Sequence, residues 1–539
     1  MTVSAEKSQA EGSGKFMVVP LIVLIMAQMG TSGDNGALSL ATAQLTSSLG
    51  ASMADIQLAN TMYSLVAGAL MVAGGMMGTI IGWKKNFRIG TLLAACGEFA
   101  MAFSPSMAIF TWGGRLLVGF GASFLVPSIL GLVPNIYKTN KDRAMAFGGV
   151  GAATGLSMFL PLIMGALLDA MGFRVTFGVL GGYFLLVFAA SFAFPAIEET
   201  GEKLKFDAVG TVLAALGLFL FIVGISQIST WGLTTAFAAA PFTIAGFSPA
   251  LPLALVGLII LAVMFKLEVG IEKKNGCALL PQSFLKTPQV LAGLAASAIT
   301  FFFMGIQAIC MTPYMQLVGG LNAVQSGLVS LVYGIPMFIV SLAAPRFLAK
   351  VNPKNIIRAG YVLMVVSLGI MSLSFVADGI SMVPLIAGFA CSGLASGLVA
   401  SQASTVVALA INDRDAAQSG GVQATCRNVG QAIAVASLGA ILLFSISSTV
   451  ASEAQMSEVV SPEVAEQVAQ RRVSLVSDEN FVTSLEGIDM TAEERAELVR
   501  INAEARVSST KTALLVGAAI IAAGLLTTGW IKTVPGNEE

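Results

Sequence analysis

Long apolar runs, each sufficient to cross a lipid bilayer as one helix, constrain this 539-residue sequence more than any other feature. A membrane-spanning α-helix needs about 20 mostly apolar residues. Hydrophobic residues make up 56% of the chain and charged residues only 11%, whereas a soluble domain carries about 25% charged residues. The composition therefore excludes a water-soluble enzyme and predicts an integral membrane protein. Fourteen runs have the required length, at roughly 16–41, 56–81, 88–104, 107–135, 144–168, 174–195, 208–227, 248–267, 289–317, 323–345, 357–377, 380–411, 417–449 and 511–532.

Two further features of the composition limit the chemistry. The sequence contains no histidine, which removes a common ligand of zinc and haem and the usual proton carrier near neutral pH. Its five cysteines have no metal-ligand spacing, and its net charge of −1 provides no basic surface for nucleic acid. We therefore expect no metal, no other cofactor and no nucleic-acid partner. Any proton transfer must use carboxylates.

The distribution of lysine and arginine predicts the orientation of the chain. Cytoplasmic loops retain these residues, and most of the 29 in this sequence fall in alternate loops on the same side as both termini. The only long polar segment, residues 450–510, falls on the other side and is rich in acids. We expect a multi-pass protein of the plasma (inner) membrane with cytoplasmic termini. The outer segment should form one or two amphipathic helices, at 459–476 and 492–507.

A short internal repeat indicates a duplicated architecture. Lys84, Arg88 and Gly90 recur at the same spacing as Lys354, Arg358 and Gly360, each set between two apolar runs. The chain is then an all-α protein of fourteen transmembrane helices: two six-helix bundles (residues 1–206 and 289–539) with two intervening helices and a linker (residues 207–288). Duplicated bundles with a site between them are the architecture by which secondary transporters achieve alternating access.

Several motifs resemble those of the fourteen-helix drug:proton antiporters of the major facilitator superfamily. Pro313-Tyr314-Met315-Gln316 and Gly334-Ile335-Pro336 resemble its ninth and tenth helices, Arg115 with Gly119 and Gly121 resembles its fourth-helix arginine motif, and Pro161 with Gly165 resembles its fifth-helix signature. The resemblance implies a monomeric transporter, not an enzyme, whose partners are a small-molecule substrate, protons and the lipid bilayer. Five residues depart from the family pattern: Thr79, Trp83, Val118, Leu160 and Met164.

Three ionisable residues inside the apolar runs are the candidates for proton coupling. Asp34 falls in the outer half of the first run, where a carboxylate must face a cavity or a partner, and it resembles the family's first-helix acid. Glu98 is flanked by Cys96 and Phe99 in the third run. Arg115 could form an ion pair with either acid.

The remaining candidates form two sets. Polar or aromatic residues within the spans predict a substrate cavity, lined by Tyr63, Gln307, Tyr314, Gln316, Gln402, Gln423 and Arg427. Small, basic or proline residues near the helix ends and in the family motifs predict gating positions, at Gly78, Gly82, Lys84, Lys85, Pro161 and Gly165.

The leading hypothesis is proton-coupled efflux of amphipathic or cationic drugs by alternating access. A carrier of one specific solute or lipid, working by symport or facilitated transport, is the alternative within the same superfamily. An integral-membrane enzyme is the alternative from another class, but the sequence contains no clustered metal ligands or nucleophile–base pair at one membrane face.

Overall fold

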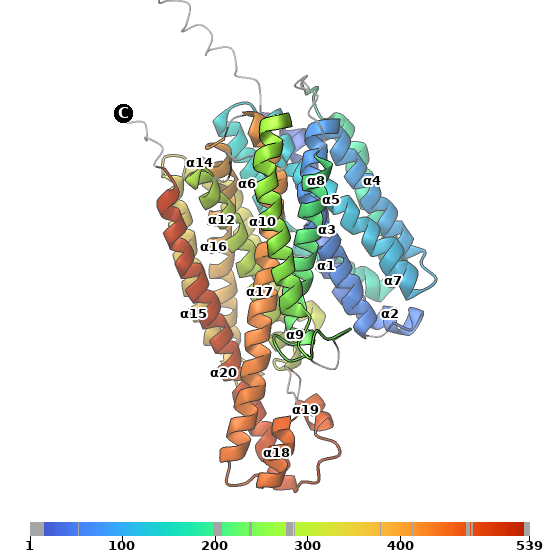
Figure 1. Cartoon of the computed structure of the whole chain (residues 1–539), viewed down its shortest axis with the longest axis vertical. Helices are drawn as coiled ribbons and strands as arrows, with labels where there is room; N and C mark the ends of the chain where they lie inside the picture. The colour runs from blue at the N-terminus through green and yellow to red at the C-terminus, as the bar shows by residue number, and fades with distance from the viewer. Residues whose placement is uncertain are drawn as a thin grey trace, which may run out of the picture.

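The computed structural model describes residues 16–51, 53–197, 207–236, 240–275, 284, 286–377, 379–411, 413–470, 475 and 478–532. These residues are mostly helical, and most of the long helices run side by side (Figure 1). A hairpin of β1 (Phe375–Val376) and β2 (Gly379–Ile380) pairs antiparallel. The α-helices are α1 (Val18–Leu40), α2 (Thr42–Leu49), α3 (Met53–Ile81), α4 (Trp83–Ala102), α5 (Leu116–Ile136), α6 (Asn140–Leu156), α7 (Phe159–Ala190), α8 (Ala208–Ser226), α9 (Ile228–Trp231), α10 (Ala250–Asn275), α12 (Pro288–Ile306), α13 (Thr312–Leu317), α14 (Ala323–Phe347), α15 (Pro353–Ser372), α16 (Met382–Ala408), α17 (Asp413–Met456), α18 (Pro462–Gln470), α19 (Asp478–Ser484) and α20 (Ala492–Gly524). Short segments of other helix types are η1 (Ile109–Arg115) and η3 (Gln307–Met311), both π-helical, and η2 (Ser191–Ala193) and η4 (Leu525–Trp530), both 3-10.

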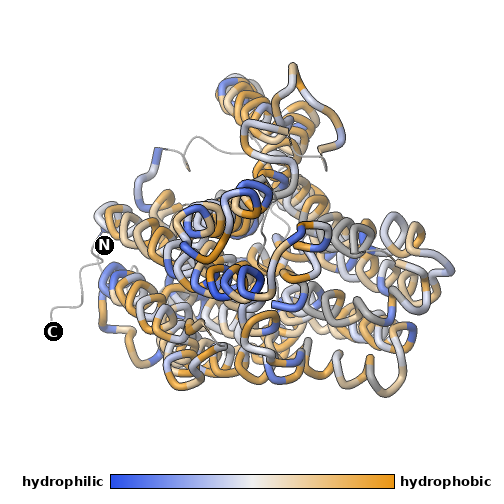
Figure 2. Tube along the Cα trace, turned by 90° about the horizontal axis from the view of Figure 1, so that it is seen from below, coloured by the Kyte–Doolittle hydropathy of each residue, from blue (hydrophilic) through white to orange (hydrophobic). Residues whose placement is uncertain are grey.

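The helices expose apolar residues to their surroundings. Leu186 on α7, Ile259 on α10 and Leu515 on α20 are 58%, 62% and 65% exposed, and hydrophobic residues lie around the whole circumference of the bundle (Figure 2). Within the described residues, ten helices are long and apolar enough to cross a membrane, and two shorter apolar segments, Val18–Asp34 and Leu65–Ile81, match two more predicted runs. The all-helical membrane architecture is therefore confirmed, whereas the count of fourteen spans stays a prediction.

The run predicted at 144–168 is not one helix. Instead, α6 ends at Leu156 and α7 begins at Phe159. A proline is tolerated in the first turn of a helix, where its missing N–H has no helical partner, but not in a helix interior; Pro161 therefore favours a new start. Further along, α7 bends at Gly172, whose φ of +81° and ψ of 167° are accessible mainly to glycine.

The long helices form two groups with an additional pair between them. In the first group α1 packs on α7, α4 packs on α5 and α7, and α3 packs on α5; in the second, α12 packs on α17, and α16 packs on α14 and α15. The helices α8 and α10 pack against each other, and α8 lies on α3 and α17. The groups meet where α6 contacts α14 and α16, and where α17 contacts α3 and α5. The divisions at 206 and 288 stay predictions.

The predicted outer segment is a folded cap joined to the second group of helices. We use the name cap for its described residues between 450 and 507, which comprise the end of α17, the helices α18 and α19 and the start of α20. Phe481, Leu485 and Leu498 are buried in the cap and belong to the same hydrophobic core as Tyr314. Figure 1 shows the cap at the bottom. We call the opposite end of the bundle, where α4 starts beside Lys84 and α14 ends beside Arg346, the basic end.

One carboxylate holds two parts of the cap together. Glu494, at the start of α20, accepts hydrogen bonds from the hydroxyl and the backbone N–H of Ser461, and also from the hydroxyl and the backbone N–H of Thr491. The hydrogen bonds from Ser461 and Thr491 stabilise the ionised form and lower the pKa of Glu494 to about 2. The ionised side chain therefore fixes the start of α20 against the segment that precedes α18.

Candidate functional site

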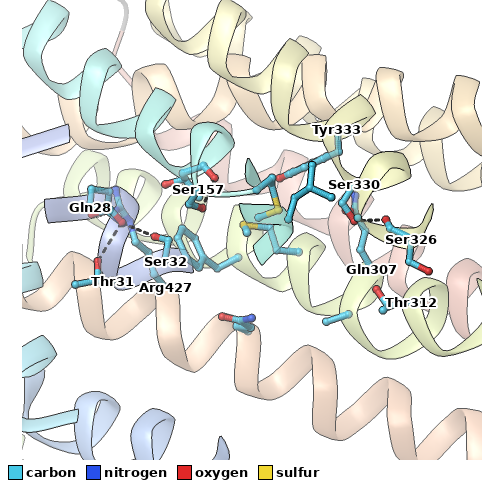
Figure 3. A pocket seen from close by; sticks show the side chains of 18 of the residues that line it. Gln28, Thr31, Ser32, Ser157, Gln307, Thr312, Ser326, Ser330, Tyr333 and Arg427 are labelled. Atoms are coloured by element: carbon cyan, nitrogen blue, oxygen red, sulfur yellow. Dashed lines mark hydrogen bonds between the residues drawn. The ribbon is translucent and has the colours of Figure 1, made fainter. Parts of the chain in front are cut away.

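A cavity of about 530 Å³ lies between the two groups of helices. Its walls combine polar side chains from α1, α6, α14 and α17 with apolar ones, including three methionines and two phenylalanines. In the view of Figure 3, Gln28, Thr31, Ser32 and Arg427 lie toward one side and Gln307, Thr312, Ser326 and Ser330 toward the other. The described polar lining residues are Gln28, Thr31, Ser32, Tyr63, Thr154, Ser157, Gln307, Thr312, Gln316, Ser326, Ser330, Tyr333, Arg427, Asn428 and Gln431.

Two irregular turns place key side chains of the site. The π-helical segment η1 ends at Arg115, and η3 begins at Gln307. A π-turn inserts one extra residue per turn and changes the direction in which the following side chains point. Pro313 follows η3 and cannot donate a backbone hydrogen bond, which disfavours a regular α-helix there. These turns are signs of local structure that hydrophobic periodicity alone does not predict.

The break between α6 and α7 also faces the cavity. Ser157 and Met158, which join the two helices, line the cavity together with Thr154. The Ser157 hydroxyl donates to the carbonyl oxygen of Thr154 at 2.7 Å. The end of α6 thus presents polar groups near the middle of the bundle.

A buried ion pair lies beside the cavity. Arg115 Nη1 is 2.7 Å from Asp34 Oδ2, and both side chains have no exposed surface. Arg115 Nε also donates to the carbonyl oxygen of Ala59 at 3.4 Å, and its guanidinium lies 4.9 Å from the centre of the Tyr63 ring. Sequence reasoning named Asp34 and Arg115 as possible partners, and the structure brings them together.

Glu98 supplies a second carboxylate to this cluster. It is fully buried on α4 and close enough to Asp34 and Arg115 to interact with both electrostatically. Neither of its oxygens accepts a hydrogen bond from an N–H or hydroxyl group of the described residues. The acid–arginine cluster, as we name Asp34, Glu98 and Arg115, therefore holds two carboxyl groups and one guanidinium.

Tyr63 connects the acid–arginine cluster to the cavity. Its ring lies under Arg115, its hydroxyl donates to the carbonyl oxygen of Thr31 at 3.2 Å, and both Tyr63 and Thr31 line the cavity. Thr31 lies one turn before Asp34 on α1. A change in the ion pair can thus reach the cavity wall through the Tyr63 side chain and the backbone of Thr31.

Four of the seven predicted cavity residues line the cavity: Tyr63, Gln307, Gln316 and Arg427. The other three lie outside it. Tyr314 packs against Phe375, with ring centres 4.5 Å apart, and donates to the carbonyl oxygen of Val376. Gln402 and Gln423 are buried, and their amides donate to Ser401 and Ser419 respectively.

Most of the predicted gating residues lie at the basic end. Gly82 joins α3 to α4 with a φ of +91°, Lys84 Nζ donates to the carbonyl oxygen of Pro195 at 2.8 Å, and Lys85 is exposed. A Cβ at Gly78 would lie 2.4 Å from the Trp83 ring, so Gly78 packs within the first group of helices. Gly165 lines the cavity, and the side chain of Pro161 lies outside the described residues.

Glycines that sequence reasoning did not select close the cavity toward the basic end. On α17, a Cβ at Gly420 would lie 2.7 Å from the Pro127 carbonyl oxygen on α5, and a Cβ at Gly421 would lie 3.0 Å from the Gly75 Cα on α3. Across the other contact, a Cβ at Gly148 on α6 would lie 2.7 Å from the Ser341 carbonyl oxygen on α14. We call these contacts the glycine floor, because each lies closer to the basic end than the cavity-lining residue on the same helix, namely Ala424 on α17, Met71 on α3 and Thr154 on α6.

Three residues that depart from the family motifs each pack against a glycine. Trp83 fills the space beside Gly78 and Gly131, Val118 lies against Gly97, and Leu160 lies against Gly33. In each case a Cβ on the glycine would approach the larger side chain to 2.6 Å or less. The larger side chains are therefore accommodated in the helix packing.

Comparisons with known proteins agree with this architecture. The sequence pattern of a family described as Major Facilitator Superfamily matches residues 22–435. The chain is 25% identical over 428 residues to the probable actinorhodin transporter of Streptomyces coelicolor, covering 78% of this chain and 71% of that protein. It is 23% identical over 380 residues to the multidrug efflux pump LfrA of Mycolicibacterium smegmatis, covering 70% and 71%. The crystal structure of human MFSD10, an organic anion transporter, has a similar fold, with a TM-score of 0.56 and 13% identity over 94% of this chain and 98% of that one.

Proposed function

Because the chain belongs to the Major Facilitator Superfamily, we propose that it exports amphipathic small molecules, drugs among them, in exchange for protons. Membership makes it a multi-pass membrane transporter. Export is supported by its relatives, which include a multidrug efflux pump and a probable actinorhodin transporter. The observation that carries proton coupling is the contact of a buried ion pair with the cavity wall through Tyr63 and Thr31.

The charge balance of the acid–arginine cluster supports proton binding. One guanidinium neutralises one carboxylate, and a second buried carboxylate without a cation is costly in a low-dielectric interior. A proton shared by Asp34 and Glu98 removes this cost, and Arg115 then pairs with the carboxylate that remains. Oδ1 of Asp34 and both oxygens of Glu98 accept no hydrogen bond from an N–H or hydroxyl group of the described residues. These oxygens are therefore the positions at which the proton binds.

Movement of Arg115 transmits proton binding to the substrate. When both acids are protonated, Arg115 loses its anionic partner and its hold on Asp34 weakens. The Tyr63 ring, which lies under the guanidinium, and Thr31, one turn from Asp34, then change position at the cavity wall. Substrate release and proton uptake are thereby linked on the same side of the membrane.

The glycine floor and the exposed lining residues support an outward-facing state. The close contacts at Gly421 and Gly148 lie between the cavity and the basic end, whereas Gln316 and Val324, at the cap end of the cavity, are exposed. With the basic end in the cytoplasm, as the lysine and arginine distribution predicts, the cavity is open to the outside and closed to the inside. Opening the floor gives the inward-facing state.

Transport by purified protein in liposomes tests this function. A panel of anionic, neutral and cationic fluorescent dyes is presented with an imposed pH gradient, and an ionophore that collapses the gradient provides the control. We expect several dyes to move against their own gradient in the direction opposite to proton flow. Movement that persists unchanged after collapse would refute proton coupling, and movement of one compound alone would favour the specific carrier.

A further inference from the structure

The charge of the cavity indicates which amphipathic molecules it binds. Of the described residues that line it, Arg427 alone is charged, and none of them is an aspartate or a glutamate. A site for cations would offer a carboxylate, since charged groups away from water need an opposite charge close by. The described lining therefore provides charge complementarity only for an anion.

The surroundings of Arg427 leave its charge uncompensated. Its guanidinium lies 5.5 Å from the centre of the Phe301 ring, and its Nη2 donates to the Ser404 hydroxyl at 3.3 Å. Among the described residues no carboxylate lies within ion-pair distance of it, in contrast to Arg115, which pairs with Asp34 at 2.7 Å. A guanidinium has five N–H donors, so most of those of Arg427 remain for a ligand. Figure 3 shows Arg427 beside Ser32 and Thr31 on one side of the cavity.

A second side chain in the cavity has a donor for which the described residues provide no acceptor. Gln307 lines the cavity at the start of η3, and its buried Nε2 has no hydrogen-bond partner in the described structure. A buried donor left without an acceptor costs free energy, and an oxygen-rich ligand would provide the acceptor. The remaining wall is apolar and soft, with Met71, Met158 and Met304, which suits aromatic or aliphatic bodies of varied shape.

We propose that the preferred substrates are amphipathic organic anions whose carboxylate, phenolate or sulfonate binds Arg427. This inference rests on the proposed function for its site and replaces the preference for cationic drugs expected from the sequence. The anionic group pairs with the guanidinium at one side of the cavity, the apolar body lies against the methionines, and an acceptor on the far part of the ligand reaches Gln307.

A matched ligand series tests the proposal by binding alone. Three probes share one dansyl fluorophore: dansylglycine (an anion), its methyl amide (neutral) and its dimethylaminoethyl amide (a cation). Dissociation constants are measured by fluorescence with purified protein in lipid nanodiscs and no pH gradient. We expect dansylglycine to bind roughly tenfold to a hundredfold more tightly than the neutral amide, as for a hydrogen bond to a charged group, and the cation to bind most weakly. Equal binding of the three probes, or tighter binding of the cation, would overturn the proposal without any variant.

Variants assign the preference to Arg427. Arg427→Gln should bind the anion and the neutral amide equally, Arg427→Lys should keep part of the preference, and Arg427→Glu should favour the cation. The matched control is Arg174→Gln, since Arg174 is exposed at the start of the second part of α7 and donates to the Ala102 carbonyl oxygen outside the cavity. An anion preference retained by a folded Arg427→Gln variant would refute the assignment. Anion binding without gradient-driven transport would refute the proposed export and leave the anion site intact.

Discussion

The glycine floor predicts that a single methyl group will shift the conformational equilibrium of the transporter. We choose Gly421→Ala, because its new Cβ would lie 3.0 Å from the Gly75 Cα and 3.2 Å from the Met71 carbonyl oxygen. Both neighbours are backbone atoms, which cannot move away by a change of rotamer. Overpacking of this kind costs about 1–3 kcal/mol.

The cost applies only to the state in which α17 touches α3. Alanine also favours a helix over glycine by about 0.5–1 kcal/mol, but this gain is the same in both states because residue 421 lies within α17. The difference between the states is therefore the steric cost alone. A coupling of about 1–3 kcal/mol changes a population ratio about 5- to 150-fold in favour of the state open at the basic end.

Distance measurements between spin labels can detect this shift. Labels at Lys141, at the start of α6, and Lys350, after α14, are exposed and lie on different groups of helices; the five native cysteines are first replaced. We expect Gly421→Ala to increase the population of the longer distance. The matched control is Gly369→Ala on α15, where a Cβ meets nothing within 4 Å. Identical distance distributions for Gly421→Ala and the parent would refute the role of the floor.

Three further predictions follow from single residues. Asp34→Asn should abolish accumulation against a gradient but retain exchange of labelled for unlabelled substrate; accumulation equal to the parent would exclude Asp34 from coupling. Because Glu98 remains as a counter-charge for Arg115, this variant should lose less stability than the about 3–5 kcal/mol expected for a buried charge left with no partner. Glu494→Gln should remove a pH dependence of cap stability. Since the pKa of Glu494 is lowered to about 2 from an ordinary 4.5, its stabilising effect is present above pH 4.5 and disappears as the pH falls toward 2. Thermal unfolding at a series of pH values tests this, and melting temperatures that fall equally with pH in the parent and the variant would contradict it. Gly172→Ala should destabilise the fold by about 1–3 kcal/mol through backbone strain alone, because its Cβ would meet only Gln44 Oε1, at 3.9 Å; an unchanged melting temperature would contradict this.

Hydrophobic runs and intramembrane charges were the most informative parts of the sequence. Apolar length predicts helices directly, and a charged group away from water needs a partner, so Asp34 and Arg115 could be named as a possible pair. Neither rule says which face of a helix points to the cavity. Tyr314 follows the π-segment η3, and its ring packs on Phe375, a direction that a regular helical register does not predict.

Close packing between distant segments was the least predictable part. Gly75 and Gly421 are separated by hundreds of residues, and glycines are common throughout the chain, so a single sequence gives no reason to join these two. The break before Phe159 is different in kind. Pro161 was identified within a motif, but the apolar run continued through it, and hydropathy alone does not detect a helix break.

The length of α17 means that a small movement at the cavity produces a large displacement of the cap. Its 44 residues extend over about 66 Å at 1.5 Å per residue, roughly twice the 30 Å hydrocarbon thickness of a bilayer, and the helix carries Gly421 and Arg427 near one end and the cap at the other. Because the cap shares a core with the second group of helices, a rocking motion of that group sweeps the cap through an arc much wider than the displacement at the cavity. A rigid protein bound to the cap would restrict this movement of the cap. The turnover rate of transport would then fall, although the bound protein lies far from the substrate.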